Sequence, residues 1–168
     1  GWNHLIGHLH EQGRMHETIM AFANRYVYGG MLQIADEVRQ TENIKHRFQN
    51  DQEIWLTERL IFVPSRFQLQ EIDQKTNAHE ASLVIGLISQ WKDKLQEHGL
   101  NWSIGVITPF RAQIAAILHH AHQEGVDLTD ITVDTVERYQ GGARDIIIMS
   151  CACNAQKTLN KITSRNPD

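Results

Sequence analysis

The stretch Ile104-Gly-Val-Ile-Thr-Pro-Phe-Arg-Ala-Gln113 joins a short apolar run to the start of an amphipathic segment. Residues 103–107 are rich in β-branched side chains and predict a short buried strand. Thr108 followed by Pro109 predicts a helix start, with the threonine as N-cap and the proline at the first helical position. We expect this helix to end near Gly125. Its apolar positions are Ile114, Ile117, Leu118 and Ala121.

Two further helices are predicted before this stretch. The first covers residues 15–27, where apolar side chains recur at helical spacing, and Gly29-Gly30 is expected to end it. The second opens at Asn77, with Glu80 three residues later as in a capping box, and Gly99 closes it. The apolar stripes are Met15, Ile19, Phe22, Ala23, Tyr26 and Val27 in the first helix, and Ala81, Val84, Ile88, Trp91 and Leu95 in the second.

Short apolar runs predict three more strands. Residues 60–63 form a run that Pro64 stops, and such a run is typical of a strand buried on both faces. Residues 131–133 and 145–150 predict two others, with a polar loop between them. Strands that alternate with helices favour an α/β fold, with a mostly parallel sheet and helices on both faces.

Composition excludes several classes of protein. The chain has 168 residues and a formal net charge of −4, from 16 Lys and Arg against 20 Asp and Glu. This balance excludes a histone-like basic protein but leaves a local basic groove open. No apolar run approaches the ~18 residues of a membrane span. Two cysteines are too few for a four-cysteine zinc site and favour a reducing, intracellular setting, and we predict no metal site.

The residues alone point to a ligand that carries phosphate. The chain has no Walker A segment, no G-x-G-x-x-G after a strand and no G-x-S-x-G elbow. Polar and turn residues follow the predicted strands in 104–113 and 133–150, at the carboxyl ends where α/β sheets bind ligands. A threonine at a helix N-terminus, beside free backbone N–H groups, suits a phosphate. That phosphate belongs either to a nucleotide or to a nucleic-acid backbone.

Four ordered segments resemble the second RecA-like domain of superfamily-one helicases, in the branch of the nonsense-decay helicase and senataxin. They are Gln12-Gly-Arg-Met-His-Glu17, Asn77-Ala-His-Glu-Ala81, residues 105–113 and residues 136–150. The resemblance implies a RecA-like three-layer sandwich, similar to P-loop NTPases but without a Walker A of its own. It assigns residues 1–154 to a partial second RecA-like domain, and residues 155–168 to a polar tail that leads toward motif VI, which the chain lacks.

The resemblance also implies roles for individual residues. Arg14 is similar to the catalytic arginine that stabilises charge on the γ-phosphate of ATP. The cofactor implied is ATP with Mg²⁺, whose metal ligands are expected on the first motor domain. The residues expected to contact the nucleotide are Gln12, Arg14, Glu137, Gln140 and Gly141, and those expected to contact the nucleic-acid backbone are Thr108, Arg111 and Thr135. Plainer alternatives are an N-cap for Thr108, a turn for Gly141, and solvated charges for Arg14 and Arg111.

The function implied is part of an ATP-dependent helicase, a nucleoside-triphosphate hydrolase that moves along single-stranded nucleic acid, with DNA slightly favoured over RNA. We expect this chain alone to be inactive, because the phosphate loop and motif VI lie outside it. The other expected partner is the first RecA-like domain, with no membrane partner, and the expected setting is cytoplasmic, or nuclear in a eukaryote. Ala143 stands where the family often has a glutamate that contacts the nucleotide ribose. The alternative is a non-catalytic nucleic-acid-binding or scaffold module that retains the RecA-like fold.

Overall fold

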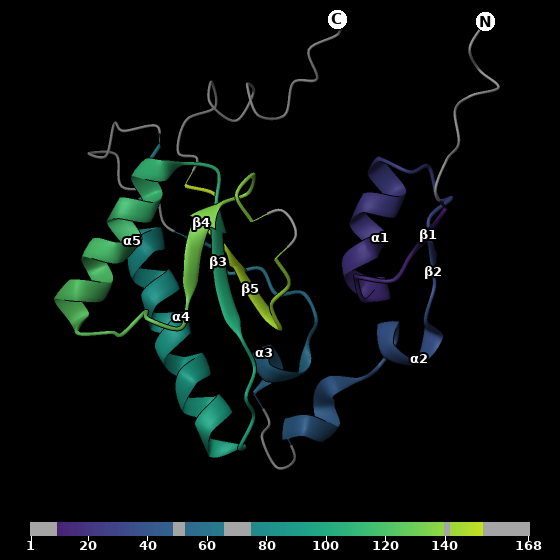
Figure 1. Cartoon of the computed structure of the whole chain (residues 1–168), viewed down its shortest axis with the longest axis horizontal. Helices are drawn as coiled ribbons and strands as arrows, with labels where there is room; N and C mark the ends of the chain where they lie inside the picture. Colours follow the sequence, from purple (N-terminus) through teal and green to yellow (C-terminus); the bar gives the residue numbers. More distant parts are fainter. Residues whose placement is uncertain (1–9, 49–52, 66–74, 140–141, 153–168) are drawn as a thin grey trace, which may run out of the picture. The chain divides into compact units, whose positions relative to one another are not determined.

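The computed structural model describes residues 10–48, 53–65, 75–139 and 142–152. The chain forms two compact units, Gly1–Val63 and Pro64–Asp168. Figure 1 labels the helices and strands of both units. The predicted tail at 155–168 lies outside the described residues, as do Gln140 and Gly141.

The first unit consists of short elements around a two-stranded parallel sheet. In chain order they are β1 (Glu11–Gln12), α1 (Glu17–Tyr26), β2 (Gln33–Ile34), α2 (Glu37–Gln40), the 3-10 helix η2 (Ile44–Phe48) and α3 (Ile54–Thr57). In the sheet, Glu11 pairs with Gln33 and Gln12 pairs with Ile34. The buried apolar side chains of this unit come from several of these segments: Met20, Leu32, Ile44, Phe48 and Leu56.

Helix α1 confirms the first predicted helix, and Gly29 and Gly30 follow its end with φ values of 60° and 82°. The apolar stripe of this helix is largely exposed. Phe22 and Tyr26 are 68% and 61% exposed, and Met20 is the residue of α1 that is buried. The helical period decides which side chains share a face, but the rest of the fold decides which face is covered.

The apolar run at residues 60–63 does not form the predicted strand. Its side chains are exposed, from 43% at Ile61 to 88% at Phe62, and no strand is assigned there. A strand needs a neighbour to satisfy its backbone N–H and C=O groups. None of the strands in the described part of the chain pairs with this run, and Pro64 has no N–H to donate. The apolar composition of residues 60–63 therefore predicted a buried strand, but these side chains are exposed.

The second unit has a three-stranded parallel sheet and two long helices. Its elements are α4 (Ala78–Glu97), β3 (Ile104–Thr108), α5 (Arg111–Glu124), β4 (Thr132–Thr135) and β5 (Ile146–Met149). The strand order is β4-β3-β5, with both pairs parallel. Parallel neighbours need a crossover connection, and α5 supplies the one from β3 to β4. Parallel strands flanked by helices are those of a RecA-like α/β fold, as predicted.

The core of this unit lies between α4, α5 and one face of the sheet (Figure 1). Ile104 and Val106 point to this face from alternate positions of β3 and are 4% and 0% exposed. Each large aliphatic side chain buried here contributes about 1.5–3 kcal/mol. This packing fixes where the carboxyl ends of the strands lie. The buried cluster is Ala81, Val84, Ile85, Ile88, Leu95, Ile104, Val106, Ile117, Ala121 and Ile131.

The helix start after β3 differs from the prediction. Thr108 is the last residue of the strand and pairs with Thr135 of β4, so it is not the N-cap. The N-cap is Phe110, which makes no side-chain capping hydrogen bond, and Pro109 therefore precedes the helix. The strand pairing extends through Thr108 and holds it in an extended conformation, so the chain turns into the helix two residues later.

Candidate functional site

The turn that carries Arg14 is closed by the side chain of Gln12. The Oε1 atom of Gln12 accepts hydrogen bonds from the backbone N–H groups of Arg14 and Met15, at 2.9 and 2.7 Å. Its Nε2 atom donates to the carbonyl oxygen of Met15 at 2.9 Å. The amide of Gln12, which the resemblance assigns to the nucleotide, is therefore engaged by its own turn.

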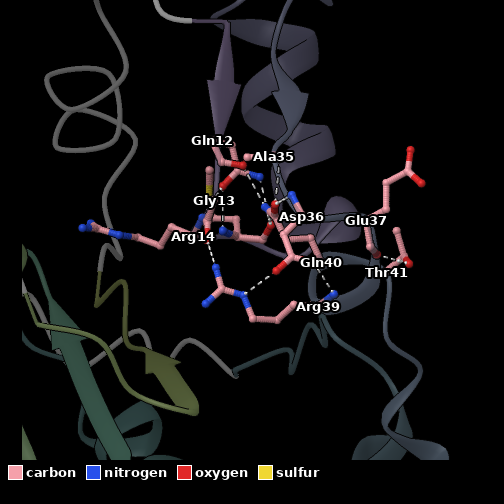
Figure 2. A network of polar contacts seen from close by, with 10 residues as sticks. Gln12, Gly13, Arg14, Ala35, Asp36, Glu37, Arg39, Gln40 and Thr41 are labelled. Carbon is pink, nitrogen blue, oxygen red and sulfur yellow. Dashed lines mark hydrogen bonds and ion pairs between the residues drawn. The ribbon is translucent and has the colours of Figure 1, made fainter.

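A second glutamine braces the same turn from α2. Gln40 is 2% exposed, and its Nε2 donates to the carbonyl oxygens of Gln12 and Met15 at 2.9 and 2.6 Å. Its Oε1 accepts from the backbone N–H groups of Ala35 and Asp36, at 3.0 and 2.8 Å (Figure 2). Sequence analysis missed Gln40, because a glutamine in a polar segment has no local pattern that marks it as buried.

Arg14 itself is exposed, and Figure 2 shows its side chain extending away from the network around it. Among the residues that the structure describes, none forms a hydrogen bond or an ion pair with its guanidinium. The neighbouring Arg39 differs, because its guanidinium donates to the carbonyl oxygen of Gly13 and lies 3.8 Å from the carboxylate of Asp36. Guanidinium is always protonated in proteins and offers a planar fork of N–H donors. Within the described part of the chain, Arg14 thus has no ion-pair partner, and its planar fork matches two phosphate oxygens.

In the second unit, two predicted nucleic-acid contacts lie side by side. Thr108 and Thr135 are register partners at the carboxyl ends of β3 and β4. Thr108 is 0% exposed and Thr135 is 7% exposed. Arg111, on the first turn of α5, is exposed. Of the three residues, Arg111 is therefore the one whose side chain solvent reaches freely.

Arg111 faces a shallow hollow between α5 and the end of β4. Its lining combines apolar side chains with two arginines and one aspartate: Arg111, Ile114, Ala115, Leu118, Val133, Asp134 and Arg138. Arg138 lies 3.9 Å from the carboxylate of Asp134, so part of its charge is compensated. Glu137 is exposed on the turn that follows β4. The hollow suits an anionic chain that also carries flat apolar groups.

A buried polar cluster ties three of the family-like segments together. The Oε1 atom of Gln113 accepts from the backbone N–H of Asn77 at 2.8 Å. Its Nε2 donates to the carbonyl oxygen of Asn77 and to Oγ of Ser150, each at 3.1 Å. The carboxylate of Glu80 accepts from the backbone N–H of Ala152, with its two oxygens 3.3 and 3.1 Å away. These hydrogen bonds hold the helix starts and the end of β5 at one edge of the sheet.

Sequence analysis quoted Gln113, Asn77 and Glu80 as parts of family-like segments but gave none of them a site role. The available signal was a polar residue at one end of each segment: Asn77 opens the first, and Gln113 and Ser150 close the other two. The described residues hold no group of three His, Cys, Asp or Glu side chains placed to bind a metal ion. No helix in that part of the chain combines the length and the apolar character that a membrane crossing needs.

The second unit, a parallel sheet flanked by helices with polar residues at its carboxyl edge, has the architecture of the RecA-like class. A family model described as an AAA domain matches residues 3–164. The chain belongs to this family, as a superfamily-one helicase-like domain of the senataxin branch.

Several proteins of similar sequence are named as helicases. Probable helicase senataxin of Homo sapiens is 33% identical over 142 residues, which are 83% of this chain and 5% of the relative. The DNA replication ATP-dependent helicase/nuclease JHS1 of Arabidopsis thaliana is 25% identical, over 95% of this chain and 12% of the relative. The DNA polymerase alpha-associated DNA helicase A of Saccharomyces cerevisiae is 27% identical, over 91% of this chain and 24% of the relative. The chain thus spans between 5% and 24% of the length of these relatives.

Proposed function

We propose that this chain is most of the second motor domain of an ATP-dependent helicase that moves along single-stranded nucleic acid. The helicase names of its relatives support this class. The observation that carries the proposal is Arg14, an exposed arginine on a turn that two glutamine side chains hold by hydrogen bonds. The proposal keeps residues 1–154 as the motor domain and 155–168 as the segment that leads toward motif VI.

In this proposal Arg14 stabilises the negative charge that develops on the γ-phosphate oxygens. ATP, bound with Mg²⁺, supplies the phosphoryl group, and the metal ligands belong to the first motor domain. Arg14 donates two N–H groups from one planar fork, which a lysine cannot do. Gln12 acts through the backbone of the turn rather than by direct contact. Glu137, which lies on the turn after β4, is proposed to contact the nucleotide, as are Gln140 and Gly141.

We further propose that single-stranded nucleic acid binds along the carboxyl edge of the sheet. Arg111 makes the direct phosphate contact, since its side chain is exposed at the start of α5. Phosphate contacts of this kind position a strand without reading its sequence. Direct contacts from Thr108 and Thr135 stay a prediction, and they require this edge to expose side chains that are buried here. DNA is favoured over RNA as the strand, and the protein is expected inside the cell, in the cytoplasm or nucleus.

The test is ATP turnover by the full-length protein that contains this chain, with single-stranded DNA and with single-stranded RNA. Arg14→Ala should lower turnover by about 10³-fold, the lower end of the effect of such arginines. The affinity for the strand without nucleotide should stay within threefold, because the contact forms only with the phosphate. Arg14→Lys should restore little. Arg25→Ala is the matched control, an exposed arginine on α1 that contacts the ring of Tyr26.

Two outcomes would overturn the proposal. Turnover within a few-fold of the wild type in Arg14→Ala would remove this arginine from the site. Strand binding without any nucleotide hydrolysis in the full-length protein would favour the non-catalytic module instead. Greater stimulation by RNA than by DNA would reverse only the proposed strand preference.

A further inference from the structure

Gln40 uses the full hydrogen-bonding capacity of its side-chain amide at the turn of Arg14. A glutamine amide has two donor hydrogens and two acceptor lone pairs, and all four are used here. The residue is 2% exposed and sits at the end of the four-residue helix α2. A buried amide that is fully bonded holds its partners in one arrangement, since any displacement leaves a buried polar group unpaired.

The two donor hydrogen bonds of Gln40 bracket Arg14. One reaches the carbonyl oxygen of Gln12 and the other that of Met15, so the amide spans the turn from one end to the other. The acceptor hydrogen bonds reach Ala35 and the residue after it, at the end of β2. The single side chain of Gln40 thus ties the turn to the second strand and to α2.

We propose that Gln40 is a positioning residue that sets where Arg14 presents its guanidinium. This inference rests on the proposed function of Arg14. A long exposed side chain can meet a phosphate oxygen repeatedly only if its backbone is fixed, and Gln40 fixes the carbonyl groups on both sides of it. Arg39 also contacts the turn, but its ion pair with Asp36 is exposed and weak in water.

The sharpest variant is Gln40→Glu. A carboxylate keeps the shape of the side chain and the acceptor toward Ala35 and Asp36. It replaces the donor amide by an oxygen that faces two carbonyl oxygens, so only the hydrogen bonds that hold the Arg14 turn are removed. Turnover should fall at least about tenfold, because a misplacement of ~1 Å in a catalytic group can cost on the order of 10²-fold. The KM for ATP and the affinity for the strand should change less than threefold.

Gln90→Glu is the matched control, since it introduces the same charge on an exposed position of α4. A double-mutant cycle distinguishes a positioning role for Gln40 from a merely structural one. If Gln40 acts through Arg14, the double variant Gln40→Glu with Arg14→Ala should turn over no more slowly than Arg14→Ala alone. Additive losses in a folded protein would overturn the inference.

The two proposals fail in distinguishable ways. Normal turnover in Arg14→Ala contradicts the proposed function. Slow turnover in Arg14→Ala together with normal turnover in Gln40→Glu contradicts the positioning role alone. If Gln40→Glu does not fold by circular dichroism, Gln40→Asn replaces it, because the shorter amide keeps the polarity but cannot reach both carbonyl oxygens at once. Normal turnover in a folded Gln40→Asn protein would equally refute the role of Gln40.

Discussion

The hydroxyl end of the Tyr139 side chain lies against Gly105, in the middle strand of the three-stranded sheet. A Cβ atom at position 105 would be 2.8 Å from Cζ of Tyr139 and 3.0 Å from Cγ of Arg144. The guanidinium of Arg144 also lies over the tyrosine ring, 5.8 Å from its centroid. A side chain at position 105 would therefore clash with Tyr139. The glycine allows this tyrosine, on the turn after β4, to pack against β3.

Gly105→Ala should destabilise the second unit by about 1–3 kcal/mol, since overpacking a close contact displaces its neighbours. Gly86→Ala on α4 is the matched control, because a Cβ there meets nothing within 4 Å. That substitution should stabilise the helix by about 0.5–1 kcal/mol. Urea unfolding of both variants checks the pair, and equal effects in the two would contradict the close packing of Tyr139.

Gln113→Leu should cost about 2–4 kcal/mol of unfolding free energy, because it removes three hydrogen bonds that the buried amide forms with Asn77 and Ser150. The measurement is the urea midpoint at constant m-value. Gln123→Leu provides the comparison, as an exposed glutamine of α5 whose replacement should change stability by less than about 0.5 kcal/mol. A destabilisation at Gln113 no larger than at Gln123 would show that the cluster does not hold the sheet edge.

Arg111→Ala should weaken single-strand binding without changing the fold. The affinity for a single strand falls with salt, and losing one phosphate contact should make the slope of log K against log salt less steep by about 0.7. Titration of a fluorescent oligonucleotide at several salt concentrations measures this slope. Lys92→Ala, which removes a cation from α4, should leave the slope unchanged. An unchanged slope for Arg111→Ala as well would assign this arginine to the solvated surface.

Asp127 gives a prediction for acid pH. Its pKa is held below the ordinary value of an aspartate because the hydroxyl of Thr129, and then its backbone N–H, donate to the carboxylate. A depressed pKa contributes stability above the unfolded-state value, and that stability is lost as pH falls through the folded value. Asp127→Asn should therefore flatten the acid limb of urea stability between about pH 5 and pH 2. An acid limb identical to the wild type would mean that the hydrogen bonds to Thr129 contribute nothing to folding.

The elements that sequence analysis predicted well have local causes. Asn77 caps α4 through the backbone N–H of Glu80, as the spacing of the two residues indicated. The stripe of α4 that includes Val84 and Ile88 is buried, and β3 begins within one residue of its prediction. Capping and amphipathic spacing act within a few residues, so they can be read along the chain.

Some residues of the candidate site could be found from the sequence, and others only from the structure. Sequence resemblance selected Arg14 and Arg111, and both are exposed. It did not select Gln40, whose partners in the turn of Arg14 lie 25 and 28 positions away in the chain. Nor did it give a role to Gln113, whose partner Asn77 lies 36 positions away. Neither side chain lies in a local pattern that distinguishes a bonded buried amide from a solvated one.

By itself, the sequence determined the α/β class, the family, the positions of the main helices and the residue types available to meet phosphate. Only the tertiary structure decided which faces are buried, that the run at residues 60–63 stays outside the sheet, and that Thr108 ends a strand. It also decided that Gln40 braces the turn of Arg14. The physical reason is range: helical period and capping are short-range effects, whereas burial, strand pairing and the partners of a buried amide depend on segments that meet only in the folded chain.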